Sequence, residues 1–242
     1  MRRVRICLPC GRTVTYRHLD VLHDALIQGW EAAGVSVDQV VGHRAHPWTF
    51  AALGYYRQHT GYAHTLVVST PDSLLAERLV FLKTEAIRYS RASTAETVDF
   101  STAEIITDPD PIIPGTHGLG VLMLSPLVLS IPGERRRRWI QQLNGTDLAA
   151  AINPRLSRLA NRPVTLQIQA DSLYLRANPR HSVLVSVKQA PSGRSSFVIG
   201  LSAPLVLAGS EADLRLAWYA GLGEKTRTGF GCIGLLEQGV GR

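Results

Sequence analysis

The order in which helical and strand patterns follow one another constrains the fold of this chain most. In the first half, apolar residues recur at helical spacing over 18–33 and 73–89. Gly34 lies where the first of these helices is expected to end. Runs with strand character precede, separate and follow the two helices, at 4–8, 48–53, 64–69 and near Ile105. This order is that of the ferredoxin-like β-α-β-β-α-β plan.

The second half is predicted to repeat this rhythm after a segment rich in proline and glycine, 107–120. The predicted strands are 119–131, 164–176, 183–188, 196–201 and 230–236. The predicted helices are a basic one over 134–143, one over 147–159 that breaks at Asn153-Pro154, and one over 210–220 that Ser210 and Asp213 cap. A polar loop is expected at 11–17 and a hairpin turn at 191–195.

These patterns predict an α+β fold of two tandem ferredoxin-like (RRM-like) halves with a C-terminal glycine-rich loop. The N-terminal half is expected to span 1–112 and the C-terminal half 119–242. The second half would carry a basic helical insertion near 134–162 and the glycine-rich loop at 221–231.

Arginine dominates the basic residues of this chain. Of 26 Lys and Arg residues only three are lysine, the formal net charge is +7, and 45% of the residues are hydrophobic. The apolar fraction is enough for a folded core. A guanidinium matches phosphate and stacks on bases, so the excess of arginine suits a nucleic-acid partner. A codon bias of a GC-rich genome would produce the same excess.

The three cysteines do not predict a metal site or a disulfide framework. Cys7 and Cys10 form a C-x-x-C pair, but Cys232 alone does not complete a zinc set, so both are interpreted as small strand residues. No metal and no cofactor is expected. The longest apolar stretch is interrupted by Pro126 and is too short to span a membrane. We therefore expect a cytoplasmic protein without a membrane partner.

The segment 221–231, Gly-Leu-Gly-Glu-Lys-Thr-Arg-Thr-Gly-Phe-Gly, has the parts of a phosphate-binding loop. Glycines let backbone N–H groups approach an anion, and the basic and hydroxyl side chains add donors. A helix precedes the segment and a strand follows it, which excludes a dinucleotide fingerprint, and Glu224 separates Gly223 from Lys225, which excludes a Walker loop. The predicted RNA contacts here are Gly221, Gly223, Lys225, Thr226, Arg227, Thr228, Gly229 and Gly231. The alternative is a flexible hairpin.

The same segment resembles the C-terminal signature of the CRISPR-associated repeat-processing endoribonucleases of the RAMP superfamily. Leu124-Ser125-Pro126 and the turn at 191–194 agree with that family. The resemblance implies a metal-independent endoribonuclease that binds CRISPR repeat hairpin RNA and cleaves it to guide RNA. It also implies that processed guide RNA, and other CRISPR effector subunits, are partners. The alternative is a non-catalytic RAMP subunit that holds guide RNA within an effector complex.

Metal-free RNA cleavage uses the 2′-hydroxyl as nucleophile and leaves a 2′,3′-cyclic phosphate and a 5′-hydroxyl. It needs a base, an acid and cations, and histidine suits both proton roles. Two clusters could supply them, one at 16–18 and one at 43–46, and the resemblance places the catalytic histidine in one of these two regions. The candidates are His46 and His43 as acid or base, His18, Tyr16 as a proton donor or acceptor, and Arg17 and Arg44 as phosphate clamps. The lysine usual in the family has no match before Lys83, so an arginine would replace it. Each histidine could instead be an ordinary loop residue.

The strongest run of charge is the predicted basic helix, in which Trp139 could stack on a base. Its predicted RNA contacts are Arg135, Arg136, Arg137 and Arg138, and Arg155 and Arg158 continue the basic character at helical spacing. The alternative is a solvated helix in an arginine-rich protein.

Overall fold

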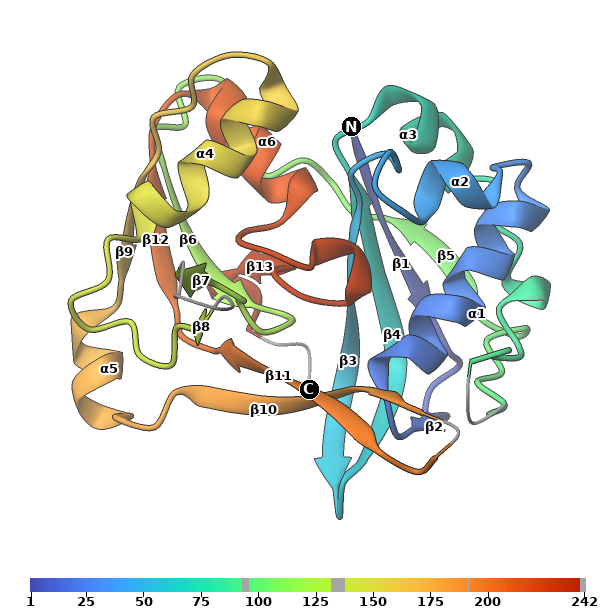
Figure 1. Cartoon of the computed structure of the whole chain (residues 1–242). Coiled ribbons are helices and arrows are strands. Elements are labelled where there is room, and N and C mark those ends of the chain that lie inside the picture. The colour runs from blue at the N-terminus through green and yellow to red at the C-terminus, as the bar shows by residue number, and fades with distance from the viewer. Residues whose placement is uncertain (93–95, 132–137, 191, 240–242) are drawn as a thin grey trace.

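The computed structural model describes residues 1–92, 96–131, 138–190 and 192–239 (Figure 1). Within them the chain forms two antiparallel sheets, one from each half, and two further pairs of strands. In Figure 1 the N-terminal half, coloured blue to green, lies beside the C-terminal half, with the helices of the N-terminal half on the side of its sheet that faces away from the C-terminal half.

The first sheet has the spatial order β3-β4-β1-β5, with β2 added beside β4. Its strands are β1 (Arg2–Cys7), β2 (Val14–Tyr16), β3 (Thr49–Arg57), β4 (Thr60–Thr70) and β5 (Glu104–Thr107). The helices are α1 (Leu19–Ala32), α2 (Val37–Val40) and α3 (Ser73–Leu79). With β2 set aside, the first and third strands in chain order lie at the centre, as the ferredoxin-like plan requires.

The second sheet has the same order, β9-β12-β6-β13, so both halves have the predicted ferredoxin-like topology. Its strands are β6 (Gly118–Met123), β9 (Gln167–Ala170), β12 (Leu205–Ala208) and β13 (Ile233–Leu235). The helices are α4 (Leu148–Ala160), α5 (Ser172–Ala177) and α6 (Glu211–Ala220). The predicted α+β fold of two tandem ferredoxin-like halves is confirmed, and the division at 1–112 and 119–242 stays a prediction.

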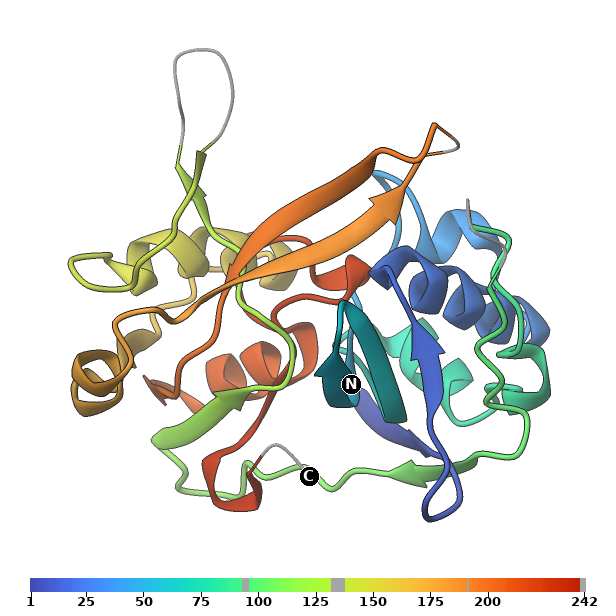
Figure 2. The ribbon, with the colours of Figure 1, turned by 90° about the horizontal axis from the view of Figure 1, so that it is seen from below.

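Two strand pairs lie outside the sheets. The hairpin of β10 (Ser182–Gln189) and β11 (Ser195–Leu201) leaves the second half and reaches across to α1 (Figures 1 and 2). The pair of β7 (Ser130–Ile131) and β8 (Arg138–Trp139) projects beside α4 in Figure 2.

The predicted basic helix over 134–143 is wrong where it can be tested, because Arg138 and Trp139 pair with Ser130 and Ile131 as a strand. Ile140 continues this connection, since its N–H donates to the carbonyl of Leu129. A strand ladder takes up backbone donors that a helix would need. Arg135, Arg136 and Arg137 lie outside the described residues.

Five further predictions of local structure are wrong in part. The strand at 164–176 ends at Ala170, because Asp171 caps a new helix by accepting from the N–H groups of Leu173 and Tyr174. The segment 11–17 includes the short strand β2, and Cys10 lies in the turn after β1 rather than in the strand. Helix α4 continues through Pro154. The helix predicted at 73–89 ends at Leu79.

The end of α3 is decided by packing on α1. The helix stops at Leu79, and a 3₁₀ turn, η1 (Thr84–Ala86), follows. Leu82 and Ile87 remain buried although no α-helix connects them. A Cβ on Gly29 of α1 would lie 2.8 Å from Cγ1 of Ile87, so the glycine makes room for this contact. The apolar periodicity that predicted a longer helix therefore records burial rather than helix.

The two halves are joined through the face of the first sheet opposite α1, and not only through the linker. Ala51, Leu53 and Val67, on the face of the first sheet opposite α1, pack with Cys232 and the partly buried Leu124. Arg3 of β1 is fully buried, lies 3.9 Å from the ring centroid of Trp218 and donates to the carbonyl oxygen of that residue. These contacts hold the two sheets, and the segment 221–231 between them, in a fixed arrangement.

Candidate nucleic-acid interface

The glycine-rich segment runs from α6 to β13 and is largely buried between the two halves. Its glycines are needed for close approach of chains. A Cβ on Gly223 would lie 2.5 Å from the carbonyl oxygen of Val128, and one on Gly229 would lie 2.8 Å from Cζ of Phe50. A Cβ on Gly231 would lie only 1.9 Å from the carbonyl oxygen of Leu222. All three have positive φ, so a side chain would be strained as well as crowded.

Several N–H groups of this segment already have protein acceptors. Leu222 donates to Gly231, Glu224 to Val128, and Gly231 to Pro126. These three amides are therefore not free to bind a phosphate. They do not form the expected open loop of backbone donors. The side chains that remain accessible are Lys225, which is exposed, and the half-buried Arg227 and Thr228.

Arg155 of α4 fixes the start of the segment. Its guanidinium donates to the carbonyl oxygens of Gly221 and Ala220 at 2.9 and 3.2 Å and to Oγ1 of Thr226 at 2.8 Å. Burial lowers the pKa of Arg155 to about 10, with the nearby Arg227 contributing in the same direction. With so many donors already bonded to the chain, Arg155 holds the segment in place more than it could hold RNA.

Arg227 ties the segment to the N-terminal half. Its Nη1 donates to the carbonyl oxygen of Ala45 at 3.0 Å, and burial lowers the pKa of its guanidinium. Thr49 of β3 adds a second link by donating from Oγ1 to the carbonyl oxygen of Phe230 at 3.1 Å. The connection brings residues 43–47 beside the segment, although they lie some 180 positions earlier in the chain.

These links form the floor of a cleft of about 820 Å³ between the halves, which we call the interdomain groove. Residues 43–47, α4 and the glycine-rich segment all contribute to its walls. The lining residues that carry polar or charged side chains are His43, Ser130, Arg155, Arg158, Glu224, Lys225, Thr226, Arg227 and Thr228. Arg158 is exposed and has no ion pair among the described residues, and Lys225 lies 5.5 Å from the ring centroid of Trp139. The groove therefore offers positive charge beside one exposed imidazole.

The structure separates the members of the second histidine cluster. His43 is exposed and lines the groove. His46 is instead bonded through Nδ1 to Oδ2 of Asp72 at 2.8 Å, and Asp72 also caps α3 by accepting from the N–H of Leu75. Arg44 is exposed and does not line the groove. Of the predicted catalytic residues, His43 is the one that meets the glycine-rich segment.

The first histidine cluster is buried elsewhere. His18 is 6% exposed, and its ring nitrogens lie 2.6 Å from Oγ of Ser186 and 3.3 Å from Oε1 of Gln189, both on β10. Tyr16 is 3% exposed, and burial raises its pKa well above the usual value. Neither residue lines the groove, so the two clusters do not form one site among the described residues.

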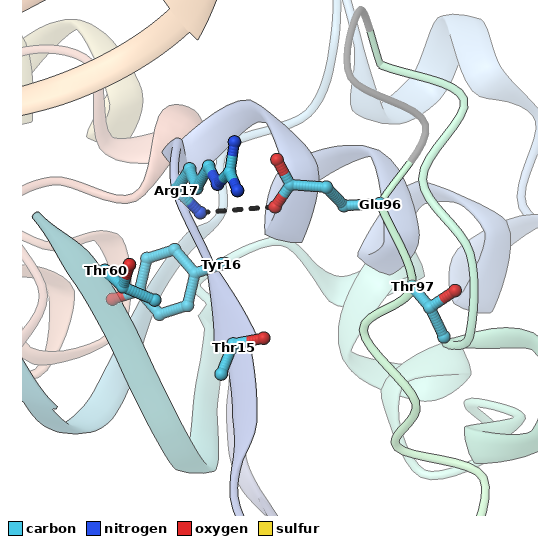
Figure 3. Close-up of a pocket in the computed structure, with 6 residues that line it drawn as sticks. All are labelled: Thr15, Tyr16, Arg17, Thr60, Glu96 and Thr97. Atoms are coloured by element: carbon cyan, nitrogen blue, oxygen red, sulfur yellow. Dashed lines mark hydrogen bonds between the residues drawn. The ribbon is translucent and has the colours of Figure 1, made fainter.

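Arg17 opens onto a different, polar pocket of about 530 Å³, drawn in Figure 3. Its backbone N–H donates to Oε2 of Glu96 at 3.3 Å, and the guanidinium lies beside the same carboxylate. This pocket has one cation beside one carboxylate, whereas the groove has four cations beside one carboxylate, Glu224, so this pocket is a poorer RNA site than the groove.

The remaining histidines do not enter the groove either. His23, on α1, stacks on Trp48 with ring centroids 5.6 Å apart, and burial lowers its pKa to about 4. His181 is buried and accepts from the N–H of Leu143. His59 occupies the β3–β4 turn, while His64 and His117 also lie away from the lining residues.

Sequence reasoning missed the partners that hold these side chains. Asp72 is 26 positions from His46, and Ser186 is 168 positions from His18, so no local pattern connects them. Arg138 is exposed on β8 and remains available, although not on the helix that was expected.

Comparison with known proteins now identifies the family. Residues 110–235, more than half of the chain, match the family described as CRISPR associated protein Cas6, C-terminal. The chain belongs to the Cas6 family. The resemblance seen in the glycine-rich segment is thereby confirmed, since the matched region contains it.

Solved structures extend the likeness to the whole chain. A protein from Pyrococcus furiosus, described as the product of a Cas6-related gene, has a TM-score of 0.69 at 14% identity, covering 98% of this chain and 99% of that one. A CRISPR associated protein Cas6 has a TM-score of 0.63 at 16% identity, covering 97% and 99%. A RAMP protein described as binding different RNA substrates has a TM-score of 0.62 at 14% identity, covering 98% and 100%. At these identities the likeness establishes the shared fold.

A search of the curated proteins found no match to this chain. Among the described residues, no helix is long and apolar enough to cross a bilayer. Within the same residues, no group of three or more His, Cys, Asp or Glu side chains could hold a metal ion.

Proposed function

We propose that this protein is a metal-independent endoribonuclease that binds CRISPR repeat hairpin RNA and cleaves it to guide RNA in the interdomain groove. The observation that carries the proposal is the meeting of exposed His43 with the cations of α4 and of the glycine-rich segment in one cleft. Membership of a CRISPR-associated family supports an RNA-processing role. A relative of the same fold is described as binding RNA.

The proposed reaction is an internal transesterification. The 2′-oxygen attacks the adjacent phosphorus, a 2′-O–P bond forms and the P–O5′ bond breaks. His43 takes the proton of the 2′-hydroxyl. The products are a 2′,3′-cyclic phosphate and a 5′-hydroxyl, and the balance requires no metal ion and no cofactor.

Lys225 is proposed to return a proton to the leaving O5′. Arginine stays protonated in proteins and is a poor proton carrier. Among the cations that line the groove, Lys225 is therefore suited to proton transfer, while Arg158 and Arg227 would stabilise the charge that develops on the phosphorane. The lysine that the family resemblance requires is then supplied from the C-terminal half.

The glycine-rich segment is proposed to act by position rather than by backbone donors. Its buried glycines and its bonds to Arg155 and Ala45 fix Lys225 and Thr228 at the groove wall. A rigid wall of this kind keeps charges near the scissile phosphate without reorganisation during the reaction.

A non-catalytic RAMP subunit that holds guide RNA is the second candidate. The observation that favours it is that His43 is the single histidine among the residues that line the groove, while His18 and Nδ1 of His46 are bonded to other parts of the protein. Binding of processed guide RNA or of other CRISPR effector subunits fits either candidate.

The deciding experiment incubates the protein with repeat RNA in EDTA and maps both ends of the products. Cleavage with a 2′,3′-cyclic phosphate is expected for the wild type and for His117→Ala, which alters an exposed histidine outside the groove. Loss of cleavage with retained binding is expected for His43→Ala. Tight binding by the wild type without any cleavage would instead support the guide-holding subunit.

A further inference from the structure

The far end of the β3–β4 hairpin carries an aromatic pair that the groove does not use. Tyr55 and Tyr62 face each other across the two strands, with ring centroids 4.7 Å apart and ring planes 7° apart. Tyr55 is 55% exposed. In Figure 1 this hairpin extends below the rest of the molecule.

These two rings lie on the face of the first sheet opposite α1. Tyr56 meets Tyr16 edge-on with ring centroids 5.7 Å apart, and Tyr16 belongs to the core formed with α1. Because neighbouring strand residues point to opposite faces, Tyr55 and its partner Tyr62 lie on the other face. Nearer the middle of β3, that face is covered by Cys232 and Leu124 of the second half, but at Tyr55 it is open to solvent.

The charge around the pair is positive. Arg57 follows Tyr55 by two positions, and so emerges on the same face, and it is exposed. From Thr49 to Thr70 the two strands contain no Asp or Glu, whereas they include Arg57 and two histidines. Gln58 and His59 connect the strands in a two-residue turn with both φ values positive, which keeps the ladder paired up to Arg57 and Thr60.

We propose that Tyr55, Tyr62 and Arg57 form a stacking platform for unpaired nucleotides of the RNA that flank its hairpin. Open aromatic rings on an uncovered sheet face stack bases in other sheet proteins that bind single-stranded RNA, and an adjacent cation meets the phosphates. This inference rests on the proposed function, because it takes the same RNA as ligand.

The position of the platform selects a flanking single strand rather than the cleaved bond. Thr49, at the start of β3, bonds to the glycine-rich segment, and Tyr55 lies six residues further along the strand. At about 3.3 Å per residue, the rings are on the order of 20 Å from that contact. RNA bound in the groove would therefore reach the platform only through several further nucleotides.

The test measures Kd for three RNAs: the repeat hairpin alone, the hairpin with an unpaired flank, and a separate oligouridine. Tyr55→Ala and Tyr62→Ala are expected to weaken binding of the flanked hairpin and of oligouridine on the order of tenfold. Binding of the hairpin alone should stay unchanged. Tyr55→Phe should bind like the wild type, because it keeps the ring. Tyr89→Ala, which removes another tyrosine that is 55% exposed, should also bind like the wild type.

The outcomes separate this inference from the proposed function. Equal losses for all three RNAs, or a lowered melting temperature that accounts for the loss, would assign the tyrosines a purely structural role as a cross-strand pair and overturn the platform. Unchanged affinity for flanked RNA would overturn it as well. If the tyrosine variants lose oligouridine binding while the wild type never cleaves repeat RNA, the platform stands and the endoribonuclease fails.

Discussion

The histidine clusters at 16–18 and 43–46 both contain histidine and arginine, but they differ in which side chains are already bonded within the protein. His18 and Tyr16 are buried, and the imidazole of His18 is bonded to the β10–β11 hairpin. His43 is exposed in a groove lined by Lys225 and Arg158. An imidazole can exchange protons with a substrate only when a ring nitrogen is free to reach it. Composition identifies candidate acids and bases, and we propose His43 over His18 because the ring nitrogens of His18 are already bonded to protein.

The largest expected effect is the loss of cleavage when the exposed cluster is changed. His43→Ala should lower the single-turnover cleavage rate by about 10²- to 10⁴-fold, since general acid–base catalysis contributes that much. The affinity for repeat RNA should change little. If the variant cleaves at the wild-type rate, the exposed cluster is not the active site, and exposure does not distinguish the catalytic histidine.

The next largest effect concerns His23, which lies on α1 between the buried and the exposed cluster. Its folded pKa of about 4 is below the ordinary value of 6.5, so between these values the unfolded chain binds a proton that the folded protein does not. Stability is therefore complete above pH 6.5 and is lost as the pH falls toward 4, by up to about 3 kcal/mol.

Urea unfolding at a series of pH values measures this dependence. His23→Phe, which keeps a ring against Trp48, should flatten the decline between these pH values. A decline of the same size in that variant would show that another group is responsible.

A smaller effect is expected when the buried cluster is changed. His18→Ala removes the bonds to Ser186 and Gln189 and should cost about 1–3 kcal/mol of unfolding free energy. Cleavage per folded molecule should remain within a few-fold of wild type, because His18 does not line the groove. If fully folded His18→Ala loses as much of its cleavage rate as His43→Ala, the buried cluster is the catalytic one.

The smallest effect is a change in salt dependence. Arg158→Gln should weaken the binding of repeat RNA by a few-fold. It should also reduce the slope of log K against log salt concentration by about one, since one phosphate contact is lost. Arg176→Gln is the matched control, because Arg176 is exposed on α5 outside the groove. Equal slopes for the wild type and Arg158→Gln would show that α4 does not contact the RNA through Arg158.

Much of the fold could be predicted from the sequence because its signals are local. The apolar stripe of α1, the Ser210 cap of α6 and the valine-rich run of β10 each depend on residues a few positions apart. The errors had two sources. A long-range contact, Ile87 packing at Gly29, shortens the predicted helix. A short hairpin, in which Arg138 pairs with Ile131, forms a strand where a basic helix was expected.

The candidate site could be predicted less well than the fold. The importance of the glycine-rich segment was visible, because four glycines and two cations in eleven residues are unusual. The reason for the glycines was not visible. It depends on Val128 and Phe50, which approach the segment from distant parts of the chain.

The sequence by itself determined the two ferredoxin-like halves, the excess of arginine and the signature of the Cas6 family. Each of these depends only on residue type and on spacing along the chain. Only the tertiary structure decided that Arg155 holds the backbone, that His18 and His46 already have partners, and that His43 and Lys225 line the same groove. The physical reason is that burial and hydrogen bonding set which charges and proton acceptors remain free, and both depend on residues that the chain brings together only when it folds.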